Sequence, residues 1–185
     1  MARASAYLLF VVAAIAVAGL FGALHDQISY TVSHEYFTRF KFLQFHLLDS
    51  PLPERVRVAI IGIRATWWMG LALGLLTGLA GFVQQTPALM RRALALSLIF
   101  ICAFTLAAAM IGLAYGYFQT RSFDLGAYAD WFIPGHLEQP RRFLCAGYMH
   151  NAAYIGGALS IPATWLFHFA FRSLHRRDLT ARPAQ

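Results

Sequence analysis

The sequence predicts an all-α integral membrane protein, a bundle of four transmembrane helices with an outer interfacial helix and a polar connection. Hydrophobic residues make up 59% of the 185 residues and charged residues only 12%, a composition outside the range of soluble globular domains. Apolar runs long enough to cross a bilayer occur four times. Most charged residues lie between these runs. We therefore expect one four-span domain over residues 1–185, with no separate soluble domain.

The first apolar run covers about residues 6–24. Its apolar core is longer than that of most signal peptides, so we expect a retained span; removal of residues 1–24 as a signal peptide is the alternative. Ala14, Ala18 and Gly22 recur every four residues. Such a stripe of small residues lets two membrane helices approach closely.

A segment rich in histidine and aromatic residues, 25–46, follows the first span. Ser33 is a suitable N-cap for a short helix over about 34–46. Aromatic residues occupy all faces of that helix, and a basic residue lies on either side of Phe40. This pattern is typical of a helix at the level of the lipid headgroups. Pro51 ends this segment.

Three further apolar runs predict the second, third and fourth spans, at about residues 56–83, 93–118 and 143–171. Pro162 is expected to bend the fourth span, and residues 172–185 form a basic tail. Glycines at four-residue spacing on the second and third spans mark close helix contacts. We expect them to contact another helix, a partner membrane protein or a second copy of the chain; they are Gly70, Gly74, Gly78, Gly112 and Gly116.

The orientation in the membrane follows from the distribution of charge. The N-terminus, the short turn after the second span and the tail carry seven basic residues against one acid, whereas the two longer connections carry seven against seven. Short, densely basic segments stay in the cytoplasm. We therefore expect a multi-pass protein of a bacterial-type inner membrane with both termini cytoplasmic. The positive charge is explained in this way, and nucleic-acid binding is not expected.

One arginine, Arg64, lies inside the second span. A charged side chain within a bilayer costs at least about 2.5–3.5 kcal/mol, so we expect it to face the bundle interior and to hold an anionic group. Trp68, four residues later, can stack on its guanidinium. The alternatives are a structural ion pair and a side chain that extends to the interface.

The fourth span contains His150 and Asn151 at a similar depth, with Tyr154 one turn further on. His25 and Asp26 end the first span on the same outer side. We expect these residues and Arg64 to form a buried polar pocket; the alternative is that they only fasten the helices together.

Histidines and carboxylates are frequent ligands of transition metals. Those expected on the outer side are candidate ligands, namely His25, His34, Glu35, His136, Glu138 and His150. Their spacing matches no established metal motif. A less favoured alternative is a b-type haem held by His25 and His150.

The sequence therefore favours an outward-facing pocket that binds a transition metal or a small anionic or redox ligand. The competing interpretation is a non-catalytic assembly or accessory subunit of a membrane complex. No motif specifies a reaction, so the sequence leaves open whether the protein is an enzyme.

Overall fold

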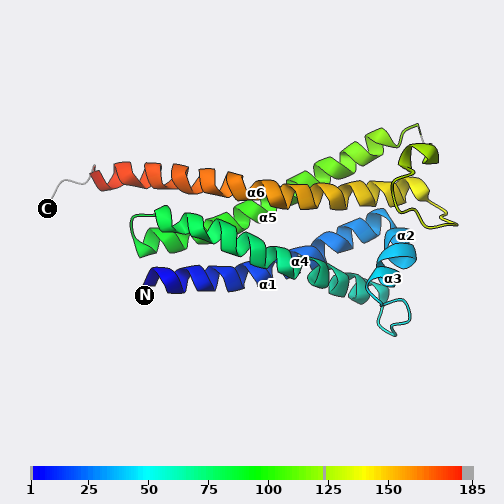
Figure 1. Cartoon of the computed structure of the whole chain (residues 1–185), viewed down its shortest axis with the longest axis horizontal. Coiled ribbons are helices and arrows are strands. Elements are labelled where there is room, and N and C mark those ends of the chain that lie inside the picture. Colours follow the sequence, from blue (N-terminus) through cyan, green and yellow to red (C-terminus); the bar gives the residue numbers. More distant parts are fainter. Residues whose placement is uncertain (1, 123, 181–185) are drawn as a thin grey trace.

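The computed structural model describes residues 2–122 and 124–180, and in this part of the chain helices are joined by short connections, without a strand (Figure 1). Four long helices form the bundle: α1 (Ala2–Val32), α4 (Glu54–Gly78), α5 (Pro87–Gln119) and α6 (Pro140–Thr180). Short helical pieces join or extend them: α2 (His34–Tyr36), the π-helical turn η1 (Phe37–Lys41), α3 (Phe42–Gln44), and the 3₁₀ turns η2 (Leu79–Val83) and η3 (Leu125–Tyr128).

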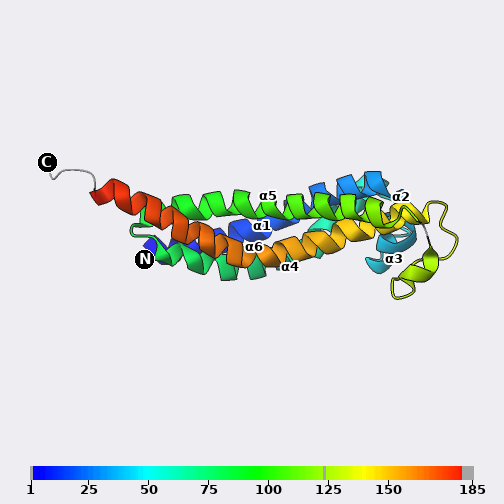
Figure 2. The ribbon, with the colours of Figure 1, turned by 90° about the horizontal axis from the view of Figure 1, so that it is seen from above.

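The four long helices run side by side, and their connections alternate between the two ends of the bundle (Figures 1 and 2). The start of α1, the turn between η2 and α5, and the far end of α6 lie at one end. The segment from α2 to α4 and the connection from α5 to α6 lie at the other, which we call the loop end. The start of α1 and the far end of α6 therefore lie opposite the two longer connections.

Three helical segments in the described part of the chain are long and apolar enough to cross a membrane: α1, α4 together with η2, and α5. The fourth predicted span lies in α6, which is long enough but less apolar. Its composition explains the difference, because it carries His150, Asn151 and His168. α6 continues through Pro162 as one helix.

The predicted glycine stripes make their contacts within the chain. Gly62 of α4 lies so close to Gly22 of α1 that an added Cβ would be 2.3 Å from the Gly22 carbonyl oxygen. Gly112 of α5 meets the backbone of Tyr148 on α6 in the same way, at 2.7 Å. Gly70, Gly74 and Gly78 face α1, and Gly116 faces α6. The glycines of both stripes therefore contact the chain's own helices.

The aromatic segment after α1 differs from the expected interfacial helix. Ser33 is the N-cap as predicted, since its hydroxyl accepts a hydrogen bond from the Tyr36 amide. The helix runs without interruption through α2, η1 and α3, with its middle turn π-helical, but Phe37 and Phe42 are fully buried. They pack with Ile61 of α4 and Phe143 of α6 in one core cluster. The π-helical turn changes the direction of the side chains, so the segment closes the loop end of the bundle.

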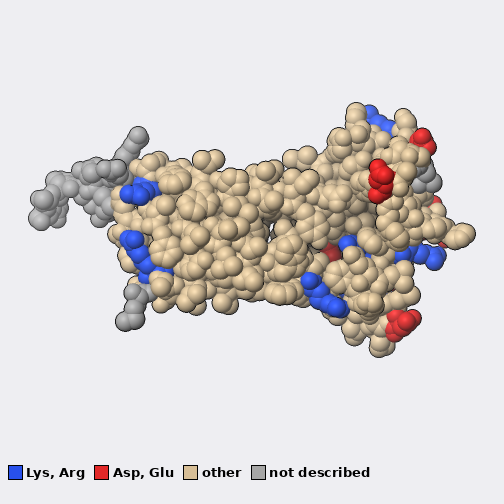
Figure 3. All heavy atoms as spheres, viewed as in Figure 1, with Lys and Arg blue, Asp and Glu red and all other residues tan. Residues whose placement is uncertain are grey.

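Charges are concentrated at the two ends of the molecule (Figure 3). On the face shown, the charged residues drawn near the start of α1 and the far end of α6 are basic among the described residues, both signs occur at the loop end, and a wide uncharged band lies between them. This is the distribution expected of a protein whose middle lies in hydrocarbon.

Candidate functional site

Three ionisable side chains meet inside the bundle near its loop end. His25 and Asp26 lie on α1, and His150 lies on α6, 124 positions after Asp26. Their exposed fractions are only 5%, 4% and 7%. Buried ionisable groups are costly unless they are paired, and these three contact one another.

Asp26 lies between the two histidines. Its Oδ1 atom is 3.1 Å from His25 Nδ1 and 3.9 Å from His150 Nε2. The two imidazole rings meet edge to face, with their centroids 4.8 Å apart. Each of the three residues can present one ligand atom such that these atoms all lie within 4.8 Å of one another.

Two neighbouring residues orient His150. The Ser29 hydroxyl lies 3.0 Å from its Nε2 atom, and the Tyr36 ring stacks on the imidazole at a centroid distance of 4.8 Å. Ser29 is one helical turn beyond His25 on α1, so the same face of α1 presents both side chains to α6. Tyr36 comes from α2, which is held in place by the Ser33 cap.

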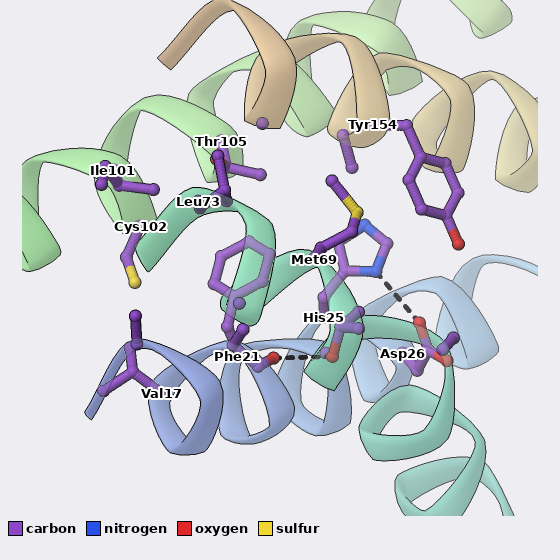
Figure 4. A pocket seen from close by; sticks show the side chains of 18 of the residues that line it. Val17, Phe21, His25, Asp26, Met69, Leu73, Ile101, Cys102, Thr105 and Tyr154 are labelled. Atoms are coloured by element: carbon purple, nitrogen blue, oxygen red, sulfur yellow. Dashed lines mark hydrogen bonds and ion pairs between the residues drawn. The ribbon is translucent and has the colours of Figure 1, made fainter. Parts of the chain in front are cut away.

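His25 projects from α1 into a cavity between the long helices (Figure 4). The volume of this cavity is about 90 Å³. The second ring nitrogen of His25, Nε2, is buried and has no hydrogen-bond partner among the described residues. Such groups are rare in folded proteins and suggest a missing ion, water or ligand.

The spacing of the three side chains fits a small metal ion. Ligand atoms about 2.0–2.1 Å from a tetrahedral ion lie roughly 3.4 Å from one another. The distances of 3.1 and 3.9 Å from Asp26 to the two histidines lie on either side of that value. Two histidines and one carboxylate also form the ligand set of many iron and zinc sites.

Arg64 and Trp68 do not reach this site, contrary to the prediction. The Arg64 side chain is exposed, donates to the Phe45 carbonyl at 3.2 Å and lies over the Phe45 ring. Trp68 is 51% exposed. Both side chains point away from the bundle interior, since the opposite face of α4 is the one packed on α1 through Gly62.

Two residues from the expected pocket are placed differently along α6. Asn151 is exposed and therefore lies outside the site. Tyr154 lines the cavity on the same helix, one turn beyond His150, although 39% of its surface is exposed. The helical period explains the split, because Tyr154 shares the face of His150 and Asn151 does not.

The other candidate ligands lie apart from the cluster. His34 is exposed and pairs with Glu54 at 2.8 Å. Glu35 accepts hydrogen bonds from the backbone amides of Glu138 and Gln139, both at 2.8 Å, just before α6 begins. The side chains of His136 and Glu138 are exposed in the connection. The six candidate metal ligands are therefore reduced to His25 and His150, with Asp26 as the third member.

Sequence reasoning missed Ser29, Tyr36 and Lys41, which also lie at the site. The spacing of four residues from His25 to Ser29 was a usable signal. Nothing in the sequence indicated that Lys41 would line the cavity, because its direction depends on the π-helical turn. Burial lowers the pKa of the Lys41 ammonium, and the nearby Asp26 carboxylate partly opposes this effect.

A haem does not suit this arrangement. A porphyrin bound by two histidines lies between their imidazoles, but these rings contact each other edge to face. The cluster has room for an ion and not for a macrocycle.

No known protein family, curated protein or solved structure shows significant similarity to this chain.

Proposed function

We propose that the protein is a multi-span membrane protein that binds one transition-metal ion through His25, Asp26 and His150. The observation that carries this proposal is a buried group of two imidazoles and one carboxylate that converges from two helices, with Asp26 Oδ1 3.1 and 3.9 Å from the two histidines. Ionisable groups inside a membrane bundle are costly and mark functional sites by default.

Each residue has a distinct role in this proposal. Asp26 supplies the negative charge that offsets the ion, and the neutral imidazoles of His25 and His150 supply nitrogen ligands. The Tyr36 ring stacked on His150 fixes the plane of the imidazole, and the ion would take the place of the Ser29 hydroxyl at His150 Nε2. Three protein ligands leave a coordination position open, which is typical of sites that bind a further ligand or substrate.

The proposed setting is a bacterial-type inner membrane with α6 as the fourth span. The three apolar helical segments support insertion, and the densely basic segments at the end that carries the termini support a cytoplasmic location for that end. The metal site then lies beneath the outer surface. His25 is seven residues before the end of α1 at Val32, about 10 Å along the helix.

A competing function for the same residues is structural, the stabilisation of helix packing, which we call the mechanical account. The contact between His150 and Ser29 at 3.0 Å links α6 to α1, and polar groups of this kind fasten membrane helices together. In that account the three residues stabilise the bundle of an assembly or accessory subunit and bind no ion.

Titration of the metal-stripped protein with Co²⁺ in detergent distinguishes the two accounts. We expect a visible ligand-field band that saturates at one Co²⁺ per chain and is lost in His150→Ala. His136→Ala is the matched control, because His136 is exposed, and it should retain the band. The mechanical account predicts no saturable band in the wild-type protein.

A further inference from the structure

The cavity between the long helices borders the whole cluster, because His25, Asp26 and His150 all line it. From the cluster it extends along α1 as far as Ala14, which is about 18 Å from Asp26 at 1.5 Å per residue. Its volume is only about 90 Å³. An apolar cavity that holds benzene measures about 150 Å³, so this one has room for a molecule of a few atoms and not for an organic substrate.

The walls of the cavity are apolar over most of its length (Figure 4). Val17 on α1, Leu73 on α4 and Ile101 on α5 all line the space. Two threonines also border it, but the hydroxyl groups of Thr66 and Thr77 donate to backbone carbonyls at 2.7 and 2.6 Å. A cavity with apolar walls stays dry and takes up apolar molecules.

One basic residue, Lys41, borders the cavity at its loop end. Its ammonium donates to Oε1 of the exposed Gln44 at 2.9 Å and lies over the rings of Tyr36 and Phe40. The charge is therefore engaged at the rim of the cavity. The space beyond the cluster is left to select for apolar molecules.

The apolar part of the cavity lies in the portion of the bundle that the proposed setting places in the bilayer. Val17, Met69 and Cys102 line it and are only partly buried, so the space approaches the lipid-facing surface of the bundle. Apolar molecules are favoured in hydrocarbon over water. The bilayer therefore supplies small apolar molecules to this side of the cluster.

We propose that the metal site binds dioxygen, which reaches the ion from the bilayer through this cavity. The inference rests on the proposed metal site and names the ligand of its open coordination position. Two histidines and one carboxylate with open positions form the ligand set of Fe²⁺ oxygenases. Dioxygen is also an apolar molecule of the size that a cavity of about 90 Å³ admits. The step is coordination of the gas to the open position, and no bond is broken.

Nitric oxide tests this inference, because it is a diatomic gas that coordinates to Fe²⁺ at open positions. The protein loaded with Fe²⁺ in the absence of air should give the electron paramagnetic resonance signal of an iron nitrosyl, which saturates with added gas. His150→Ala should lose this signal, and His136→Ala, at an exposed position, should keep it. A wild-type protein that shows the Co²⁺ band and no nitrosyl signal would overturn the dioxygen inference alone. A protein with neither would overturn the metal site as well.

Two valines of α1 test the route through the cavity. Val17→Phe places a ring in the cavity, toward Cys102 (Figure 4), and should slow formation of the nitrosyl about tenfold or more, because the added bulk fills the passage. Val17 lies eight residues before His25, about 12 Å along the helix, so the Co²⁺ band should remain. Val12→Phe is the matched control, since Val12 is 64% exposed, and should react like the wild type. Equal rates in Val17→Phe and wild type would overturn the route.

A second variant and a second ligand make the test independent of one substitution. Leu73→Trp fills the cavity from α4 and should also slow the nitrosyl, which decides the question if Val17→Phe loses the Co²⁺ band and is therefore misfolded. Azide, an anionic ligand of the ion, should bind equally fast in Leu73→Trp and wild type, because an anion enters from the polar loop end. Azide slowed as much as nitric oxide would show that the variant disturbs the ion and not the passage, and would overturn the inference.

Discussion

The Asp26 side chain occupies the central position at the residue scale, because its Oδ1 atom is 3.1 Å from His25 Nδ1 and 3.9 Å from His150 Nε2. Removal of its charge leaves two imidazoles without an acid between them. The two histidines of the cluster come from different helices, so the cluster forms only when α1 and α6 are correctly packed.

Asp26→Asn should reduce the affinity for a divalent metal by roughly 100-fold or more, since an anionic ligand is replaced by a neutral amide of the same shape. Competition with a chelator during Co²⁺ titration measures this change. Asp49→Asn, at an exposed site in the loop, should leave the affinity unchanged. Comparable affinity in Asp26→Asn and wild type would remove the carboxylate from the ligand set.

Lys41 makes the stability of the folded protein depend on pH in the alkaline range. Burial lowers its pKa in the folded state, so below that folded-state pKa the native protein carries the full cost of a partly buried ammonium. As the pH rises from the folded-state pKa toward the ordinary lysine value of about 10.4, the folded form loses its proton first and stability increases. The difference in melting temperature between wild type and Lys41→Met, measured by thermal unfolding at each pH, should show this rise. A flat difference between pH 8 and 11 would contradict it.

At the element scale, α1 and α4 pack with their backbones in contact at Gly22 and Gly62. The stripe of small residues predicted that α1 makes a close contact, and the spacing of the glycines on α4 predicted the same for that helix. Which helix each stripe would face was not readable from the spacing, because the pattern is the same for a contact within the chain and for one with a partner.

Gly62→Ala should destabilise the α1–α4 pair by about 1–3 kcal/mol, as other overpacked contacts are destabilised, because the new Cβ would meet backbone atoms of Gly22 and Ala23 at 2.3–2.6 Å. Gly19→Ala is the control within a helix: its Cβ would have an ordinary contact of 3.5 Å with Ile63. It should be neutral or slightly stabilising. Thermal unfolding followed by circular dichroism reports both. Equal melting temperatures for the two variants would show that the contact is not tight.

In the aromatic segment the start of the helix could be predicted from the sequence, but its π-helical turn could not. Ser33 was identifiable as a cap from its residue type and position. The π-helical turn η1 in the following helix depends on tertiary packing, since Phe37 and Phe42 pack in a core shared with α4 and α6. Packing of this kind overrides local preference, and it also directs Lys41 into the cavity.

At the scale of the whole molecule, hydrophobic periodicity and charge predicted four long helices and an end that carries both termini, and the fold has both features. The convergence of His25, Asp26 and His150 followed from their similar distances to the loop end. Arg64 lies on the face of α4 that points away from the cluster. The depth of a residue along a helix does not say which face of the helix carries its side chain. Depth therefore predicted part of the cluster and also included three residues that do not reach it, Arg64, Trp68 and Asn151.

The proposed topology predicts which sites react with a membrane-impermeant thiol reagent in intact cells. In a chain with Cys102→Ala and Cys145→Ala, a cysteine at Asp49→Cys or His136→Cys should be labelled from outside. Arg92→Cys, near the start of α5 at the opposite end of the bundle, should be labelled only after permeabilisation. Labelling of Arg92→Cys in intact cells would reverse the orientation.

The metal content of the purified protein is the most direct test of the central claim that His25, Asp26 and His150 form one ion site. Inductively coupled plasma mass spectrometry should find about one transition-metal ion per wild-type chain and almost none in His150→Ala, with His136→Ala equal to wild type. A wild-type protein that remains free of metal after equilibration with transition-metal ions, or a His150→Ala variant that retains the full content, would contradict it.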